Sequence, residues 1–352
     1  MFDNTQIRSS MRVVDNWIYM NTLEGSPLPN RSAGTLSRSV REGMLNGTVN
    51  KKRNESIAQT RAMGVVARFL QTRRNYVTFA RTKADCVRHI LTLLGSGIRG
   101  RLLISESFRS HFPKSKTPAQ IVPEYIPDRI TGETLLDMLK EDVSVLFLEA
   151  VDTASGALNP LREMASICRE AGVKLVLDAS LYLGAFNYDP AEVPVDILIA
   201  EGNRWLLGPE EVYIIYSSLN KRPTQLDSTP PFGYLSALSR SLLMLGDCEM
   251  TDLENYIQLL IEQFIAGIQE SPFELISPRN RAERSAIALF RHPEMEAVYI
   301  GEALLEHRIV CGVTGDRIAI SPHAYNTPAE IDKVLDALRK IEGRFGEQPE
   351  SG

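Results

Sequence analysis

Two oppositely charged side chains stand three residues apart in a short loop between apolar runs. The loop reads EGNRWLLGP over residues 201–209, and the pair is Glu201 and Arg204. A guanidinium stays protonated at neutral pH, so Arg204 could bind a phosphate or a carboxylate but could not act as a nucleophilic amine. A carboxylate repels an anionic ligand unless it is paired. The spacing predicts a Glu201–Arg204 ion pair; a solvent-exposed Glu201 and a purely structural Arg204 are the alternatives.

Two more charged residues follow strand-like segments. Asp178 ends the apolar run VKLVLD, and doubly wound sheets bind ligands at the carboxyl ends of their strands. Lys83 lies in FARTKADCVR, at a turn from a strand to a helix, where backbone N–H groups and the Thr82 hydroxyl could bind an anion. Glu201 and Asp178 would be the acid–base candidates of such a pocket, and Lys83 would be a phosphate clamp or a relocated amine. The simpler alternatives are a strand-end carboxylate that caps a turn and a surface lysine at a helix start.

Alternating strand and helix patterns predict how these residues are positioned. The expected strands are residues 76–79, 101–105, 143–151, 173–178, 195–200 and 212–216, and the expected helices are residues 84–94, 134–140 and 161–172. Short, continuously apolar strands are typical of a parallel sheet covered on both faces. Residues 15–240 therefore predict an α/β domain with a mainly parallel, doubly wound sheet.

The rest of the chain predicts a smaller unit. The stretch 217–250 is rich in loop residues and is the expected domain boundary. Residues 241–345 then predict a C-terminal α+β domain, with residues 1–14 packing on it. Two helix starts are expected at capping boxes, which are Thr251 with Glu254 and Thr327 with Glu330, the latter with Pro328 at the first helical position.

Composition limits the classes of function. The net charge is −5, which gives no support for a nucleic-acid partner. No apolar run approaches the roughly 18–20 residues that span a bilayer, and the N-terminus lacks a signal-peptide core. The scattered cysteines form no CxxC pair and favour reduced thiols in a cytoplasmic protein without a metal site: Cys86, Cys168, Cys248 and Cys311.

Four strings, in order along the chain, resemble those of class V aminotransferases, the family that includes cysteine desulfurases. They are IYMNTLEGSPLP (18–29), LVLDASLYLGAF (175–186), GNRWLLGPEEVYIIY (202–216) and RIAISPHAYNTPAEID (317–332). The resemblance implies fold type I of the pyridoxal phosphate (PLP) enzymes. It also implies a dimer with active sites at the subunit interface.

The resemblance assigns roles to single positions. It makes Asp178 the contact of the cofactor's pyridine nitrogen and puts Arg204 at the position of the Schiff-base lysine. Glu201, Thr82 and Lys83 then fall around the cofactor phosphate, and Asn203 is a cofactor-contact candidate at the position of a histidine that is frequent in this loop. His111 would be the ring nearest the stacking position, which itself aligns with Arg109 or Ser110, and Thr153 would approach the ring substituents.

Several positions depart from the family pattern. Arg204 replaces the lysine, and Lys83 stands where small hydroxylated residues are usual. Ala319 stands where an arginine normally clamps the substrate carboxylate, with Arg317 one pleat along the strand. His323 is expected to be structural, and the surroundings of Cys311 do not match the desulfurase nucleophile loop.

These departures lead to three hypotheses. The first is a protein without covalent PLP: either a repurposed, PLP-independent enzyme of specialised metabolism that binds a small anionic metabolite, or a pseudoenzyme subunit in a homodimer or a heterodimer with a paralogue. The second is an aminotransferase- or lyase-type enzyme that binds PLP or its amine form, PMP, non-covalently through Asp178 and Thr82 and acts on an amino-acid-derived substrate. The third is an interaction module whose pocket is filled by apolar side chains such as Leu181 and Tyr182.

Overall fold

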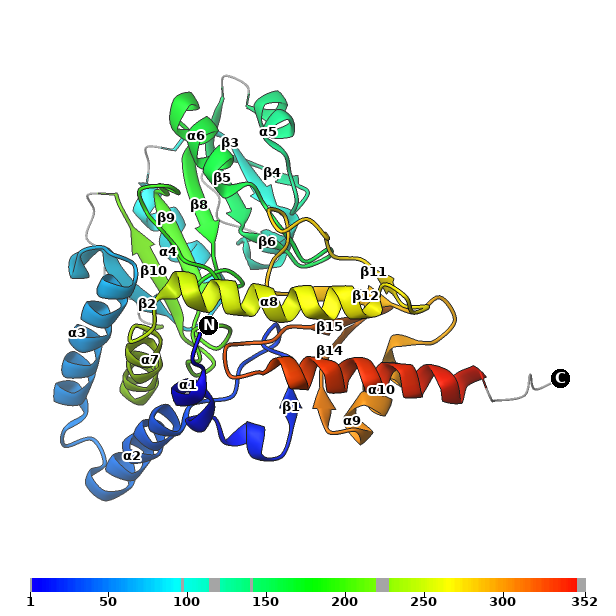
Figure 1. Cartoon of the computed structure of the whole chain (residues 1–352). Coiled ribbons are helices and arrows are strands. Elements are labelled where there is room, and N and C mark those ends of the chain that lie inside the picture. The colour runs from blue at the N-terminus through cyan, green and yellow to red at the C-terminus, as the bar shows by residue number, and fades with distance from the viewer. Residues whose placement is uncertain (1, 96–97, 114–120, 140–141, 220–227, 347–352) are drawn as a thin grey trace.

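A seven-stranded sheet forms the centre of the larger part of the molecule (Figure 1). The computed structural model describes residues 2–95, 98–113, 121–139, 142–219 and 228–346. The strand order is β2-β10-β9-β8-β5-β3-β4. The bounds are Val77–Ala80 (β2), Gly100–Ser105 (β3), Ile121–Ile126 (β4), Val143–Glu149 (β5), Lys174–Asp178 (β8), Ile197–Glu201 (β9) and Tyr213–Ser217 (β10).

The sheet is mixed, because β10 runs antiparallel to both β9 and β2. The strands from β9 to β4 are parallel, as the sequence predicts. The expectation of a parallel strand at residues 212–216 is wrong. The connection from β9 to β10 is residues 202–212, which contain no helix. A parallel crossover needs a dozen or more residues and usually a helix, so this return pairs antiparallel.

Both faces of the sheet are covered, which explains its continuously apolar strands. Val145 and Phe147 of β5 face one core cluster, and Leu146 and Leu148 face the other, all of them with no solvent exposure. The covering helices include α4 (Lys83–Leu94), α5 (Gly132–Met138) and α6 (Leu161–Ala171). Helix α6 ends at Gly172 in the left-handed conformation, as expected for a C-cap.

Besides the short helix α1 (Thr5–Ser9), three longer helices lie where the sequence indicated none. Helices α2 (Asn30–Asn46), α3 (Lys51–Phe69) and α7 (Phe232–Leu245) pack together at the β2 edge (Figure 1). Helix α7 occupies much of the stretch expected to be loop-rich; residues 220–227 of that stretch lie outside the described residues. A Cβ at Gly233 would overlap the Ser39 side chain, so this glycine permits the close approach of α7 to α2.

The smaller unit combines a four-stranded antiparallel sheet with three helices. Its strand order is β11-β12-β15-β14, and its bounds are Glu274–Leu275 (β11), Ala288–Arg291 (β12), Gly312–Thr314 (β14), Arg317–Ile320 (β15), Met250–Ile268 (α8), Ala297–Glu306 (α9) and Pro328–Gly346 (α10). The N-terminal segment joins it, since β1 (Ile18–Tyr19) pairs with β13 (Ile309–Val310).

Only one of the two expected capping boxes forms. Thr327 and Glu330 bond each other's backbone N–H groups at 3.3 and 3.0 Å at the start of α10. At the start of α8 the prediction is wrong: the Glu254 carboxylate accepts from the backbone of Asn187 at 2.9 Å, and the Thr251 hydroxyl accepts from its side chain. A tertiary partner has replaced the local cap.

Candidate active site

The site begins where β5 and β8 end side by side. Glu149 and Asp178 are register partners at the carboxyl ends of these parallel strands. Lys83, the first residue of α4, reaches across to both. Its Nζ lies 2.6 Å from Glu149 Oε1 and 2.9 Å from Asp178 Oδ2. The same ammonium lies 4.0 Å from the centroid of the Phe108 ring. Lys83, Glu149 and Asp178 are called the floor triad below.

The floor triad is buried, so its charges are strongly coupled. The three side chains are 11%, 10% and 5% exposed, in the order Lys83, Glu149, Asp178. Burial alone would lower the pKa of Lys83, but the two carboxylates raise it above the usual range of a lysine. Burial raises the pKa of Glu149, with the charge of Asp178 adding to the effect and Lys83 opposing it. Lys83 is thus held as an ammonium and is a poor candidate for a relocated Schiff-base amine.

The floor triad lines a cavity of about 230 Å³, below the roughly 300–1,000 Å³ usual for ligand pockets. The other lining residues are Leu23, His111, Val151, Thr153, Ser180, Leu181, Glu201, Arg204 and Tyr213. Six of the eight predicted site residues therefore come together here. Among these lining residues the formal charges are three carboxylates and two permanent cations.

Arg204 is tied to protein groups on two sides. Its Nε donates to Glu201 Oε2 at 2.9 Å, so the ion pair expected from the spacing forms, and its Nη1 donates to the backbone carbonyl of Leu23. The Ser26 hydroxyl donates in turn to the carbonyl of Arg204 at 2.6 Å. These contacts fasten the N-terminal segment to the loop after β9. Arg204 and Glu201 are 23% and 16% exposed, so the pair lies at the wall of the cavity rather than on the surface.

Two predicted residues do not line the cavity. The Thr82 side chain caps α4 by accepting from the backbone of Asp85 at 3.1 Å. Asn203 is buried and faces a second cavity, beside Gly25 and Tyr19. Thr82 therefore serves as a helix cap. Asn203 lines a different cavity from Glu201 and Arg204.

In the segment expected to provide a stacking ring, residues 104–113, neighbouring side chains have different partners. Phe108 is buried and presents its face to Lys83, whereas Arg109 pairs with Glu106 and lies 3.8 Å over the Tyr125 ring. His111 lines the cavity, and burial followed by the charge of Lys83 lowers its pKa. The aromatic ring that contacts the floor triad is therefore Phe108, which lies against the Lys83 ammonium.

Of the two apolar side chains predicted to fill the pocket, one lines it. Leu181 lines the cavity, whereas the ring of Tyr182 stacks on Phe186 with centroids 5.0 Å apart.

The string SPHAYNT is structural, as expected for His323. His323 is fully buried; its Nε2 lies 3.0 Å from the carbonyl of Trp205, and its Nδ1 accepts from the backbone of Ala324. Burial lowers its pKa to about 4, so it is a neutral imidazole. Its ring stacks on Tyr325 with centroids 5.3 Å apart.

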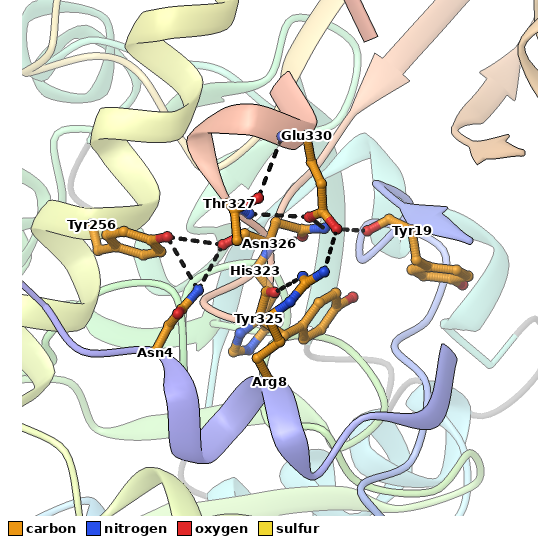
Figure 2. Close-up of polar contacts among 9 residues, drawn as sticks. All are labelled: Asn4, Arg8, Tyr19, Tyr256, His323, Tyr325, Asn326, Thr327 and Glu330. Carbon is orange, nitrogen blue, oxygen red and sulfur yellow. Dashed lines mark hydrogen bonds and ion pairs between the residues drawn. The ribbon is translucent and has the colours of Figure 1, made fainter. Parts of the chain in front are cut away.

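The same string holds the N-terminus to the smaller unit (Figure 2). Arg8 donates to the carbonyl of Tyr325 at 2.6 Å and pairs with Glu330 at 2.8 Å. The carbonyl of Asn326 accepts from Asn4 and from Tyr256, both at 2.9 Å. We call the set in Figure 2 the signature network; its members are Asn4, Arg8, Tyr19, Tyr256, His323, Tyr325, Asn326, Thr327 and Glu330.

Neither Ala319, at the position of the family's substrate clamp, nor the neighbouring Arg317 lines the cavity. Ala319 is buried in β15, and Arg317 donates to the carbonyl of Ala154 and pairs with Asp316. Cys311 has a pKa raised to about 12, chiefly by burial, so its thiol stays protonated.

Sequence reasoning missed Glu149. The signal was available, because Glu149 closes an apolar strand as Asp178 does. The expected strand ran on to residue 151, which placed the carboxylate inside it.

The residues present do not fit a PLP ring held in the usual way. The carboxylate of Asp178 that would pair with a pyridinium nitrogen already pairs with Lys83, and Oδ1 of Asp178 accepts from the backbone of Ser180 at 2.9 Å.

Comparison with known proteins confirms the resemblance. Residues 119–218 match the family described as aminotransferase class-V. A kynureninase from Deinococcus radiodurans is 24% identical over 254 residues, covering 61% of this chain and 60% of the relative, and a cysteine desulfurase from Escherichia coli is 23% identical over 64% and 65% of the two chains. The chain thus spans about three-fifths of the length of these relatives.

Solved structures confirm the fold. A cysteine desulfurase from Thermococcus onnurineus superposes with a TM-score of 0.83 over 97% of this chain and 99% of that one, at 16% identity. The fold is therefore fold type I of the PLP enzymes. Within the described residues, no helix combines the length and hydropathy needed to cross a membrane.

Proposed function

We propose that this chain, which resembles the class V aminotransferases and has their fold, uses the cavity at the ends of β5, β8 and β9 without covalent PLP. The observation that carries the proposal is the state of the two permanent cations that line the cavity. Lys83 is held between two carboxylates, and Arg204 is held by Glu201 and a backbone carbonyl. Neither offers the deprotonated amine that aldimine chemistry needs.

We propose a PLP-independent enzyme in preference to an inert pocket. Glu149 is a buried carboxyl group with a raised pKa, and it is paired with the Lys83 ammonium in the lining of the cavity. Such a pairing is typical of acid–base sites. Glu149 would exchange a proton with the ligand, while Asp178 holds Lys83 in place.

The charges lining the cavity bear on the ligand. A small anionic metabolite remains the prediction from sequence, but the three carboxylates outnumber the two cations, and both cations are already paired. A neutral or zwitterionic, amino-acid-derived molecule meets less repulsion. Non-covalent PLP or PMP would require the Lys83–Asp178 pair to break first.

The assembly is a separate proposal. Five apolar side chains near the α2–α3 turn are more than half exposed: Val40, Met44, Leu45, Val49 and Ile57. We call them the α2–α3 tip. A cluster of this kind is typical of a protein interface. It supports a dimer, either with a second copy or with a paralogue, as a pseudoenzyme partner subunit would form.

An absorbance experiment tests the central proposal. Purified protein is incubated with PLP and, separately, PMP, desalted with and without borohydride, and analysed by spectroscopy and intact mass. We expect no retained cofactor and no band near 410–430 nm. A reducible adduct mapped to Lys83, or any stoichiometric retained cofactor, would sink the proposal.

A further inference from the structure

We propose that the Lys83 ammonium substitutes for the protonated ring nitrogen of a cofactor and that this side chain closes the cavity to PLP. The inference rests on the proposed function and names the group responsible for it. Asp178 Oδ2 meets Lys83 Nζ at 2.9 Å, which is the hydrogen-bond distance at which a carboxylate would hold a ring N–H. One cation of the chain thus takes the place of one cation of a ligand.

Position on the helix makes this substitution possible. Lys83 is the first residue of α4, and its side chain runs from the helix N-terminus over the carboxyl ends of β5 and β8. It therefore crosses the space between a phosphate at the helix N-terminus and a ring at Asp178. The small volume of the cavity, about 230 Å³, agrees with a side chain lying inside it.

Glu149 holds the ammonium in this position. With Asp178 as its only acid partner, Lys83 could swing outward and yield to a ligand. The second carboxylate, at 2.6 Å, and the Phe108 ring, at 4.0 Å, fix the inward position. Removal of Lys83 alone would leave two adjacent buried carboxylates, so the informative variant also neutralises Glu149.

The test measures the binding of 4′-deoxypyridoxine 5′-phosphate, a PLP analogue without the aldehyde, so that surface lysines form no adducts. Binding is measured by equilibrium dialysis to the wild type, Lys83→Ala, Lys83→Ala/Glu149→Gln and the control Lys174→Ala. Lys174 is the matched control because it also pairs with an aspartate at 2.8 Å, but at the exposed start of β8. Circular dichroism confirms that each variant is folded.

We expect the double variant to bind the analogue roughly tenfold more tightly or better, because a cavity that is open less than about a tenth of the time loses at least that factor in apparent affinity. The wild type and Lys174→Ala should bind equally weakly. A folded double variant that binds no more tightly than the wild type overturns the inference and leaves the proposed function intact. Retention of PLP by the wild type would overturn both the inference and the proposed function.

Discussion

The signature network is partly buried and the floor triad is almost fully shielded from solvent, and the two balance their charges differently. In the network, one guanidinium, Arg8, meets one carboxylate, Glu330, and the neighbouring amides and carbonyls are bonded to each other. In the floor triad, one ammonium meets two carboxylates. A balanced network is suited to holding segments together. An unbalanced one keeps a carboxyl group ready to change its protonation state, which is what an acid–base site requires.

Loss of the shared cation should produce the largest effect. Lys83→Met should lower the free energy of unfolding by roughly 3–5 kcal/mol, because removing one partner leaves uncompensated buried charge. Urea unfolding at pH 7 measures this, with the exposed Lys174→Met as the control. Adding Glu149→Gln should recover part of the loss. If Lys83→Met were as stable as the wild type, the pairing of the ammonium with Glu149 and Asp178 would not stabilise the fold.

The network should respond nearly as strongly at its carboxylate. Glu330 pairs with Arg8 and caps Thr327, and it is 5% exposed. Glu330→Ala should cost roughly 2–4 kcal/mol, since it combines a lost cap with an unpaired guanidinium. Glu302→Ala, on the exposed face of α9, is the control. A cost no greater than the control's would mean that the N-terminal segment is held elsewhere.

Acid should separate the two regions by the sign of their response. His323 has its pKa lowered from 6.5 to about 4, so the unfolded chain binds a proton more readily than the folded one, and stability is lost as pH falls from about 6.5 toward 4. From pH 7 to pH 5 its contribution should fall by about 2 kcal/mol. Glu149, with a raised pKa, acts in the opposite direction: its burial penalty is present at high pH and relieved on acidification.

Urea midpoints across that pH range, for the wild type, His323→Gln and Glu149→Gln, measure both responses. The slope should become flatter in His323→Gln and steeper in Glu149→Gln. Parallel curves for all three proteins would contradict the assignment.

Arg204 should matter less for stability than either region, because it is partly exposed. Arg204→Lys should cost about 1 kcal/mol or less, from the loss of its fork of hydrogen bonds. We also expect it to form no reducible adduct with PLP while Lys83 is present. An aldimine band in this single variant would show that the cavity was open all along.

The smallest change in stability is expected at the α2–α3 tip. Met44→Glu should alter the unfolding free energy by under about 0.5 kcal/mol, as for surface positions generally. It should nevertheless lower the molar mass seen by light scattering if this surface joins two chains. Glu55→Gln, on α3, is the control. An unchanged molar mass would direct the search for a partner to another face.

Local patterns predicted most of the larger domain. The strands β2, β3, β5, β8 and β9 and the helices α4, α5 and α6 were evident because those strands are mainly apolar and those helices have a regular period. Strand β4 was missed, because Pro123 and Glu124 interrupt its apolar run. Helices α2 and α3 gave no such pattern, since much of their surface is polar and exposed. The direction of β10 depended on a connection length, which the strand pattern alone does not contain.

The candidate site was predicted in its members and less well in its pairings. Asp178, Glu201, Arg204 and Lys83 do line one cavity. The Glu201–Arg204 pair followed from a spacing of three residues. The contacts of Lys83 did not, because Glu149 is 66 residues away along the chain and Asp178 is farther still.

The floor triad also constrains how this chain could evolve. A replacement of Arg204 by lysine would not restore cofactor binding as long as Lys83 stays paired with Asp178. Loss of Lys83 first would strand two carboxylates and endanger folding, so it would have to follow a change at Glu149. We therefore expect the effects of substitutions at Lys83, Glu149 and Arg204 to be non-additive, so that only certain orders of substitution would open the cavity to a cofactor. Lys83, a single side chain at the start of α4, thus limits which substitutions could follow one another.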